Sequence, residues 1–382
     1  MTAHVPLSVL DLVPRVSGAD EGTSLRNTVD IVRRAEDAGY ERYWFAEHHS
    51  NPGVLGSSPA VQIALVAPAT TSIRLGSAGV QIGHRTPLAV VEEFGLIDAL
   101  YPGRLDLGIG RSLSRPAPDQ EGPPRLPPQP KRTTDEHASN GLLLPAPYDL
   151  SQTFSPERLE HHFGLLQQPG AYAPDYASQI ADVLAFLEGS YVSPQGFSAI
   201  AAPGQGADIQ VWILGASAGS SAAVAGKNGL PFVASYHHSP ATVVEAVEAY
   251  RAAFQPSNKL ATPYVAVSAD VVVAPTDAEA QELASGYPAW VRSIRRAEGA
   301  VPYPTPSEAA ELTWDDGDRA LVDDRVRTQL RGEPARVADL LEQLQEATGA
   351  DELSLTTIVH SHEARVRSFE LIAAEWQRRG HR

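Results

Sequence analysis

The sequence predicts a (β/α)8 TIM barrel, formed as a single domain over residues 1–382 with a long insertion after the fourth strand. Two observations lead to this fold. Short apolar segments alternate with helix-like segments along most of the chain, a pattern typical of parallel strands joined by helices. Eight of these segments fit strands, the number that closes such a barrel. An open doubly wound sheet is disfavoured, because residues 12–18 contain one glycine where that fold has a glycine-rich turn.

Four strands are expected within the first 110 residues. Apolar runs that fit strands alternate there with segments in which apolar residues recur at helical spacing. Ser24 is a candidate cap for the first helix. The expected strands cover residues 7–12, 43–47, 73–80 and 104–110, and the helices between them cover residues 24–39, 59–70 and 87–100.

The other four strands are expected after residue 175. Pro334 fits the first turn of a late helix, where its missing N–H costs nothing. The expected strands cover residues 210–214, 231–235, 264–273 and 352–359, and the helices cover residues 175–188, 219–227, 240–254, 277–296 and 334–348, with a closing helix to about residue 379.

The segment from about residue 112 to 170 interrupts this alternation. It has no sustained period and contains prolines at positions 123, 124, 127, 128 and 130. We therefore expect a long irregular loop, which is a lid over the barrel mouth, a disordered insertion or a domain linker. His161 and His162 within it are expected to be solvated.

Charge and composition disfavour several classes of function. The chain has 30 Lys and Arg against 46 Asp and Glu, a net charge of −16, so its field repels nucleic acid and anionic membranes. The absence of cysteine rules out disulfides, thiolate metal ligands and thiol nucleophiles. Residues 1–11 show no basic segment ahead of an apolar run, and no run is long enough to span a membrane. We expect a soluble cytoplasmic protein.

The first candidate site follows the second expected strand, at Glu47, His48 and His49. Loops after the carboxyl ends of barrel strands build the active site in this fold. A histidine there can act as a general acid or base near neutral pH, although a capped strand end with one exposed imidazole fits as well. A zinc site is disfavoured because no third ligand stands at a suitable spacing, so no metal is expected.

The second candidate site is the turn of small residues after the fifth expected strand. Small residues let the backbone approach a ligand closely, and amides at a helix N-terminus with hydroxyls beside them suit a phosphate dianion. Many turns between strand and helix are small for geometric reasons only. The candidate cofactor-binding residues here are Ser217, Ala218, Gly219 and Ser220.

Arg111 stands at the carboxyl end of the fourth expected strand. An arginine at this place binds a phosphate with two parallel hydrogen bonds, or pairs with a carboxylate inside the barrel. Arg104 and Asp106 lie earlier in the same strand. We expect both of them to hold the base and interior of the barrel in place.

The end of the third expected strand lacks bulky side chains and is a candidate surface for a flat ring system, with tight packing as the alternative. Its residues are Gly76, Ser77, Ala78, Gly79 and Val80. Tyr236, His237 and His238 follow the sixth expected strand, and they either line a substrate cavity or are ordinary loop residues.

Together these motifs resemble the luciferase-like flavin monooxygenases, in particular a bacterial group found in natural-product pathways. The resemblance covers nearly the whole chain except about residues 113–169 and rests on the order and spacing of its motifs. They are Ala46-Glu47-His48-His49, then Ala99-Leu100-Tyr101-Pro102-Gly103-Arg104 followed by Asp106-Leu107-Gly108, then Trp212-Ile213-Leu214-Gly215 with its serine-rich turn, and Gly349-Ala350-Asp351-Glu352-Leu353.

The resemblance implies a flavoprotein homodimer that takes reduced FMN from a separate flavin reductase and uses dioxygen to oxidise an organic small molecule. It implies that His48 stabilises the flavin intermediate. It also implies that Arg111 and the turn at residues 217–220 bind the FMN phosphate, and that residues 76–80 face the isoalloxazine ring.

Two other functions fit the same resemblance. A deazaflavin-dependent hydride transfer would call for extra basic residues near the phosphate turn, because that cofactor has a longer acidic tail, and Arg111 and Arg115 are the evident ones. A non-catalytic flavin-binding subunit is disfavoured by the retention of His48 and the phosphate turn.

Overall fold

Eight parallel strands close into a barrel in the computed structural model, which describes residues 5–112, 115, 132–149, 151, 153 and 155–381. Strand β10 pairs with both β9 and β12, which completes the ring and confirms the predicted fold. Two short strands extend it: β4 (Val80–Gln81) beside β5, and β11 (Leu330–Gly332) beside β10. The barrel strands are β1 (Leu7–Asp11), β2 (Arg42–Phe45), β3 (Arg74–Ser77), β5 (Leu105–Gly110), β8 (Ile209–Gly215), β9 (Phe232–Ser235), β10 (Val265–Val273) and β12 (Glu352–Thr356).

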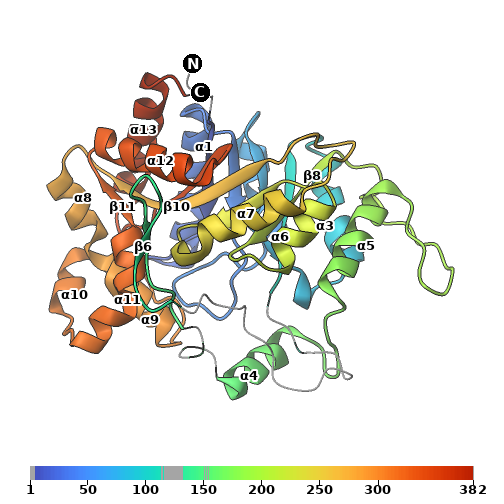
Figure 1. The fold of residues 1–382 in the computed structure, drawn as a ribbon, viewed down its shortest axis with the longest axis horizontal. Helices are drawn as coiled ribbons and strands as arrows, with labels where there is room; N and C mark the ends of the chain where they lie inside the picture. The colour runs from blue at the N-terminus through green and yellow to red at the C-terminus, as the bar shows by residue number, and fades with distance from the viewer. Residues whose placement is uncertain are drawn as a thin grey trace.

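One helix packs outside the barrel after each strand, as Figure 1 shows. Both chain ends lie at one end of the barrel, at the top of the view. No helix among the described residues is long and apolar enough to cross a membrane. The helices of this layer are α1 (Glu21–Asp37), α2 (Pro59–Val66), α3 (Pro87–Asp98), α5 (Tyr176–Glu188), α6 (Ser220–Lys227), α7 (Val243–Ala253), α12 (Pro334–Thr348) and α13 (His362–Arg378).

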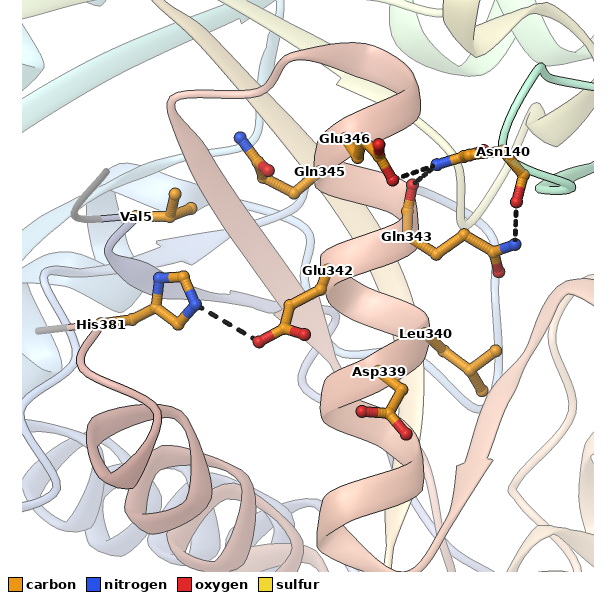
Figure 2. A pocket seen from close by; sticks show the side chains of 9 residues that line it. All are labelled: Val5, Asn140, Asp339, Leu340, Glu342, Gln343, Gln345, Glu346 and His381. Carbon is orange, nitrogen blue, oxygen red and sulfur yellow. Dashed lines mark hydrogen bonds and ion pairs between the residues drawn. The ribbon is translucent and has the colours of Figure 1, made fainter. Parts of the chain in front are cut away.

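The insertion contains regular structure, so the expectation of an irregular loop is wrong for these parts. Helix α4 (Pro156–Leu166) begins with the Ser155 side chain accepting from the Arg158 amide, and Leu159 and Phe163 are buried one turn apart. A hairpin of β6 (Glu136–His137) and β7 (Leu143–Leu144) precedes it. Asn140 at the hairpin tip exchanges hydrogen bonds with Gln343 of α12 (Figure 2).

Four helices rather than one separate β10 from β11. The expected helix over residues 277–296 is split, because a short 3-10 turn at Ala284–Gly286 interrupts it. Tyr287 and Trp290 of this region pack against Leu10 and Ile358, so the added helices cover part of the barrel mouth. The four helices are α8 (Asp277–Leu283), α9 (Tyr287–Arg295), α10 (Pro306–Glu311) and α11 (Asp316–Thr328).

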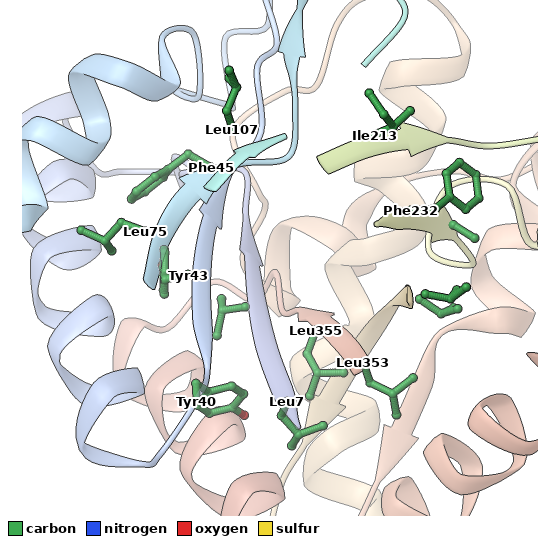
Figure 3. Close-up of a cluster of buried hydrophobic side chains, with 14 of the residues drawn as sticks. Leu7, Tyr40, Tyr43, Phe45, Leu75, Leu107, Ile213, Phe232, Leu353 and Leu355 are labelled. Atoms are coloured by element: carbon green, nitrogen blue, oxygen red, sulfur yellow. The ribbon is translucent and has the colours of Figure 1, made fainter. Parts of the chain in front are cut away.

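The main hydrophobic core lies between the outer face of the barrel and the helices. Figure 3 shows side chains of this layer, and those that it labels are all buried. Successive residues of a strand point to opposite faces, so in β2 Tyr43 and Phe45 face the helices while Trp44 faces the barrel interior. This alternation gives the barrel a packed interior as well as a packed outer layer.

A buried ionic network closes the amino-terminal end of the barrel, which we call the base. Arg42 donates to Asp106 (2.9 Å) and to Glu352 (3.2 Å), and Arg74 donates to Asp106 (2.7 Å). The indole N–H of Trp44 donates to the same Asp106 carboxylate (2.9 Å). The role expected for Asp106 is therefore confirmed.

Two further predictions can be compared with the structure. The Arg104 guanidinium donates to the carbonyls of Ile73 and Thr70 at the base, as expected. The predicted helix cap at Ser24 is wrong. Asp20 caps α1 by accepting from the Thr23 amide, so the helix begins earlier and Ser24 lies inside it.

Candidate active site

The carboxyl ends of the strands form the other end of the barrel, which we call the mouth. In Figure 1 it lies away from the chain termini, on the side of α4. A cavity of about 700 Å³ lies outside the mouth, between α12, the hairpin tip and the chain near Val5 and His381 (Figure 2). Because active sites of this fold lie at the mouth, this outer cavity is not the candidate site.

Glu47, directly after β2, links the first candidate site to β4. Its buried carboxylate accepts from the Gln81 amide (3.0 Å) and contacts His49 Nε2 (3.0 Å), while the Gln81 side chain donates to the Glu47 carbonyl (2.7 Å). The neighbouring His48 makes no such side-chain contact within the described residues. Of the two histidines, His48 is therefore the one free to meet a ligand.

His48 follows the carboxyl end of β2 at the mouth. Its surface is exposed, yet surrounding protein lowers its pKa by burial, and the nearby His49 lowers the pKa further. A ring that is both accessible and enclosed by protein is expected at the wall of an open mouth. The lowered pKa keeps the imidazole neutral near pH 7.

His237 and His238 lie across the mouth from His48. They follow β9, which is four strands away from β2 in either direction around the barrel. Burial lowers the pKa of both rings, and the charges of Arg325 and of a protonated His48 lower it further, for His238 to about 3. The structure therefore brings the histidines of the first site and those after β9 around one mouth.

Arg325 and Asp270 complete this side of the mouth, and sequence reasoning missed both. Buried Arg325 comes from α11 and donates to the Tyr287 hydroxyl (2.8 Å), with its guanidinium 3.9 Å from Asp270 of β10. Burial raises the pKa of Asp270. Arg325 Nε and Asp270 Oδ2 are buried and lack a hydrogen-bond partner within the described residues. Asp270 stood out as a carboxylate within an otherwise apolar strand, and that signal could have found it.

The start of α6 forms the candidate phosphate site. Gly219 is the N-cap residue and provides no side-chain cap for the helix. The Tyr176 hydroxyl donates to the Ile109 carbonyl (3.5 Å). Burial raises the pKa of Tyr176, while the positive charge of Arg111 lowers it. Gly110 of β5 pairs with Leu214 of β8, so the exposed Arg111 and the turn at residues 217–220 follow the ends of neighbouring strands. A cation beside free helix amides suits an anion.

The end of β3 divides into packing residues and residues at the mouth. A Cβ on Gly76 would lie 2.6 Å from Trp44 Cδ1, so close packing at the base requires glycine there. Ser77 is buried and donates to the Gly108 carbonyl (2.8 Å), and Val80 belongs to the outer core. The remaining two residues of the predicted ring surface, Ala78 and Gly79, are partly exposed. A Cβ on Gly79 would lie 2.8 Å from the Gly108 carbonyl oxygen, so close packing requires glycine there as well.

Helix α4 of the insertion reaches the mouth. Gln167 donates to the Gly83 carbonyl (2.9 Å), and the His162 and His84 rings lie 6.1 Å apart between centroids. Burial and the His162 charge lower the pKa of His84 to about 4. The expectation that His162 is solvated is therefore wrong, because it packs against His84 and Phe163; His161 is exposed.

A small cavity of about 50 Å³ lies beside the loop after β9. Tyr148 of the insertion lines it together with His238, Arg295 and Arg325. Arg295 is paired with Asp324 of α11 (2.7 Å) and lies over the Tyr148 ring. Within the described residues, no group of three or more His, Cys, Asp or Glu is placed to hold a metal ion.

Comparison with known proteins matches the whole barrel. The family described as luciferase-like monooxygenase matches residues 7–139 and 182–352, which include His48, residues 76–80, Arg111 and the turn at residues 217–220. The uncharacterized protein YvbT of Bacillus subtilis (strain 168) is 35% identical over 374 residues, covering 98% of this chain and 97% of YvbT.

Two solved structures share the fold. The apo structure of MsnO8 is 28% identical with a TM-score of 0.74 and covers 98% of both chains. The oxygenating constituent of 3,6-diketocamphane monooxygenase from the CAM plasmid of Pseudomonas putida, solved with FMN, is 19% identical. Its TM-score is 0.62, with coverage of 97% of this chain and 98% of that one, and this likeness concerns the fold alone.

Proposed function

Because the chain belongs to the luciferase-like monooxygenase family and is an oxidoreductase, we propose that it is a flavin-dependent monooxygenase. It binds reduced FMN at the barrel mouth and uses dioxygen to oxidise an organic small molecule. The observation that carries this proposal is that Arg111 and the uncapped start of α6 follow the ends of the paired strands β5 and β8. That pair is a phosphate site beside the small residues at the end of β3.

The residues at the mouth fit the two ends of FMN. Arg111 and the amides and hydroxyls of the turn at residues 217–220 would hold the phosphate dianion. Ala78 and Gly79 would lie against the flat ring, because they present little side chain to the mouth. When bound, the flavin supplies the redox and oxygen chemistry, so the protein has to supply binding, orientation and shielding.

His48 is the residue we assign to the reacting end of the site. Its imidazole is neutral near pH 7 because its pKa is lowered, so one ring nitrogen can donate a hydrogen bond and the other can accept one. Helix α4 and the aromatic cluster of Tyr287 and Trp290 cover parts of the mouth and limit the access of water.

Deazaflavin-dependent hydride transfer is less well supported by the charges at the mouth. The second basic residue considered for a longer acidic tail, Arg115, is already engaged. Its guanidinium pairs with Glu160 (2.9 Å) and donates to the Ala171 carbonyl (3.2 Å). Of these two arginines, Arg111 is then left to meet a polyanionic tail, which favours the single phosphate of FMN.

Three parts of the proposal rest on the family resemblance. We infer that a separate flavin reductase supplies the reduced FMN, that two copies assemble as a homodimer, and that the enzyme works in the cytoplasm. Light scattering of the purified protein measures the oligomeric state. A monomer at all concentrations would remove the dimer from the proposal without touching the flavin site.

Anaerobic titration with reduced FMN and with reduced deazaflavin tests the proposed function, followed by stopped-flow mixing with dioxygen. We expect selective binding of reduced FMN and an oxygen-dependent flavin transient whose lifetime is shorter in His48→Ala. Selective binding of deazaflavin would replace the proposal with hydride transfer. Binding of neither cofactor would leave a non-catalytic barrel.

A further inference from the structure

The mouth has two halves, and the candidate flavin residues occupy one of them. Arg111, the turn at residues 217–220 and Ala78–Gly79 belong to β3, β5 and β8, which are neighbours in the barrel. The other half is built by β9, β10 and α11. It carries His237, Ser268 and Arg325, none of which has a part in flavin binding in the proposed function.

Ser268 holds the His237 ring by its Nδ1 atom. Strand β10 points Ser268 inward, because Val267 and Ala269 on either side of it belong to the outer core. Ser268 Oγ lies 2.7 Å from His237 Nδ1 and donates to the Ala234 carbonyl (3.3 Å). A hydroxyl has one proton, so when it is given to the carbonyl the oxygen accepts from Nδ1–H. Ser235 Oγ lies 3.3 Å from the same Nδ1, so both serine hydroxyls contact this nitrogen. With the Ser268 proton on the carbonyl, the proton of the neutral ring lies on Nδ1.

The other ring nitrogen of His237 is left as a bare acceptor. Nε2 makes no hydrogen bond to any residue that the structure describes, and the ring is partly exposed. Burial lowers the pKa of His237 well below its ordinary value, and the charges of Arg325, His238 and His48 lower it further. The ring therefore stays neutral, and the Nε2 lone pair is available at the mouth.

We propose that His237 is a substrate-binding residue whose Nε2 accepts a hydrogen bond, with Ser268 as the positioning residue that fixes its tautomer. A neutral acceptor at this place selects a substrate that presents a hydroxyl or N–H group toward β9. It disfavours a group with lone pairs alone, because two acceptors facing each other repel. The inference rests on the proposed function in one respect, that the mouth is where the substrate binds.

The first test measures the tautomer in the unliganded full-length protein. Nitrogen NMR of protein labelled with 15N-histidine distinguishes a protonated from a bare ring nitrogen, and His237→Phe assigns the signal by its loss. We expect a neutral ring with the proton on Nδ1 from pH 6 to 8, within the range in which an ordinary histidine titrates. A proton on Nε2 in the wild-type protein would overturn the inference, whatever the flavin experiments give.

The second test uses cyclohexanol and cyclohexanone as probes of matched size that differ in one hydrogen-bond donor. Dissociation constants are measured by NMR titration with FMN present. We expect cyclohexanol to bind about fivefold more tightly than cyclohexanone, the effect of one neutral hydrogen bond. His237→Phe should abolish the preference. Ser268→Ala should reduce it and shift the tautomer populations, an effect that a merely structural role would not produce.

A matched control separates the ring from general effects of the substitution. His137→Phe, on the exposed hairpin, should keep the fivefold preference. Equal affinity for the two probes in the wild-type protein, or no binding of cyclohexanol up to its solubility, would overturn the inference. Binding of reduced FMN is measured on the same samples, so failure of the flavin site is distinguished from failure of the His237 site.

Discussion

The base and the mouth of the barrel differ in how fully their buried charged side chains are hydrogen-bonded. At the base, Asp106 accepts from Arg42, Arg74 and Trp44, so each buried charge meets an opposite charge or a donor. At the mouth, Arg325 Nε and Asp270 Oδ2 are buried without a hydrogen-bond partner within the described residues. An unsatisfied buried polar atom costs about 1–3 kcal/mol, so these two atoms lower the stability of the mouth.

This difference teaches where stability and function are located. The network at the base joins the amino-terminal ends of several strands and stabilises the closed sheet. The mouth keeps neutral histidines and unpaired groups, which destabilise the empty protein but are available to a ligand. Substitutions at the base should therefore change unfolding, and substitutions at the mouth should change binding.

Asp106→Asn should produce the largest effect. It leaves the buried Arg42 with Glu352 as its remaining counter-charge and removes the ion pair of the partly buried Arg74, and breaking a buried ion pair costs about 3–5 kcal/mol. The measurement is the free energy of unfolding from denaturant titration. Asp37→Asn on the exposed surface of α1 is the matched control and should stay within about 0.5 kcal/mol of wild type. A variant as stable as the control would show that the base network does not hold the barrel.

Arg111→Ala should weaken binding without weakening the fold. Loss of a charged hydrogen bond to phosphate costs about 2 kcal/mol, or about 30-fold in the dissociation constant of reduced FMN. The unfolding midpoint should not change, because the side chain is exposed. Arg33→Ala removes the same charge from the exposed face of α1 and should leave FMN affinity unchanged. An equal loss of FMN affinity in Arg111→Ala and Arg33→Ala would show that the change in net charge causes the effect.

The mouth should lose stability in mild acid. The folded-state pKa of His84 is lowered from 6.5 to about 4, first by burial and then by His162 and His49. As the pH falls below 6.5, His84 is protonated in the unfolded chain, whereas in the folded chain it stays neutral until about pH 4. Stability therefore declines in that window by about 1 kcal/mol once solvent screening is allowed for.

His84→Phe should remove this contribution. Unfolding free energies of wild type and variant, measured between pH 7 and 4, should then differ in slope. If the unfolding free energies of the two proteins changed with pH in parallel, His84 would not be the source of the acid sensitivity. Hydrogen exchange of α4 provides a local measurement of the same effect, since the His162 ring packs against His84.

The base should respond to acid at a lower pH and by a smaller amount. Burial alone would raise the pKa of Glu36, but hydrogen bonds from the amides of Ile73, Ser72 and Thr71 outweigh it and lower the pKa to about 2. The stabilisation is present above the unfolded value of 4.5 and is lost as the pH falls through about 2. Because the carboxylate is partly exposed, we expect at most about 1 kcal/mol.

Glu36→Gln measures this contribution. The variant should be less stable than wild type at neutral pH, and the difference should fade between pH 4.5 and 2 as the wild-type carboxylate is protonated. A difference that stays constant over this range would mean that hydrogen-bond geometry rather than charge stabilises the link between α1 and β3.

The strands could be predicted from sequence because each one is a short apolar run between helices with clear spacing. The hairpin and α4 were missed because prolines dominate the surrounding composition. The local signals of α4 were present, namely Ser155 before Pro156 and the buried pair Leu159 and Phe163. Helix α11 was missed because its face is mostly polar, with four aspartates among thirteen residues.

The site could be predicted only in part. Position at the ends of strands identified His48, Arg111 and the turn at residues 217–220, since parallel strands end at the same rim. The sequence could not separate Gly76, which packs on Trp44, from the mouth residues Ala78 and Gly79. Nor could it pair Arg325 with Asp270, because that contact depends on how α11 folds back over the mouth.

The most direct measurement is a crystal structure of the full-length protein with FMN. We expect the phosphate within hydrogen-bond distance of Arg111 and the first amides of α6, the ring against Ala78 and Gly79, and His237 Nε2 left uncovered. A phosphate bound at another turn, or a ring lying over His237, would contradict the division of the mouth into a flavin half and a substrate half.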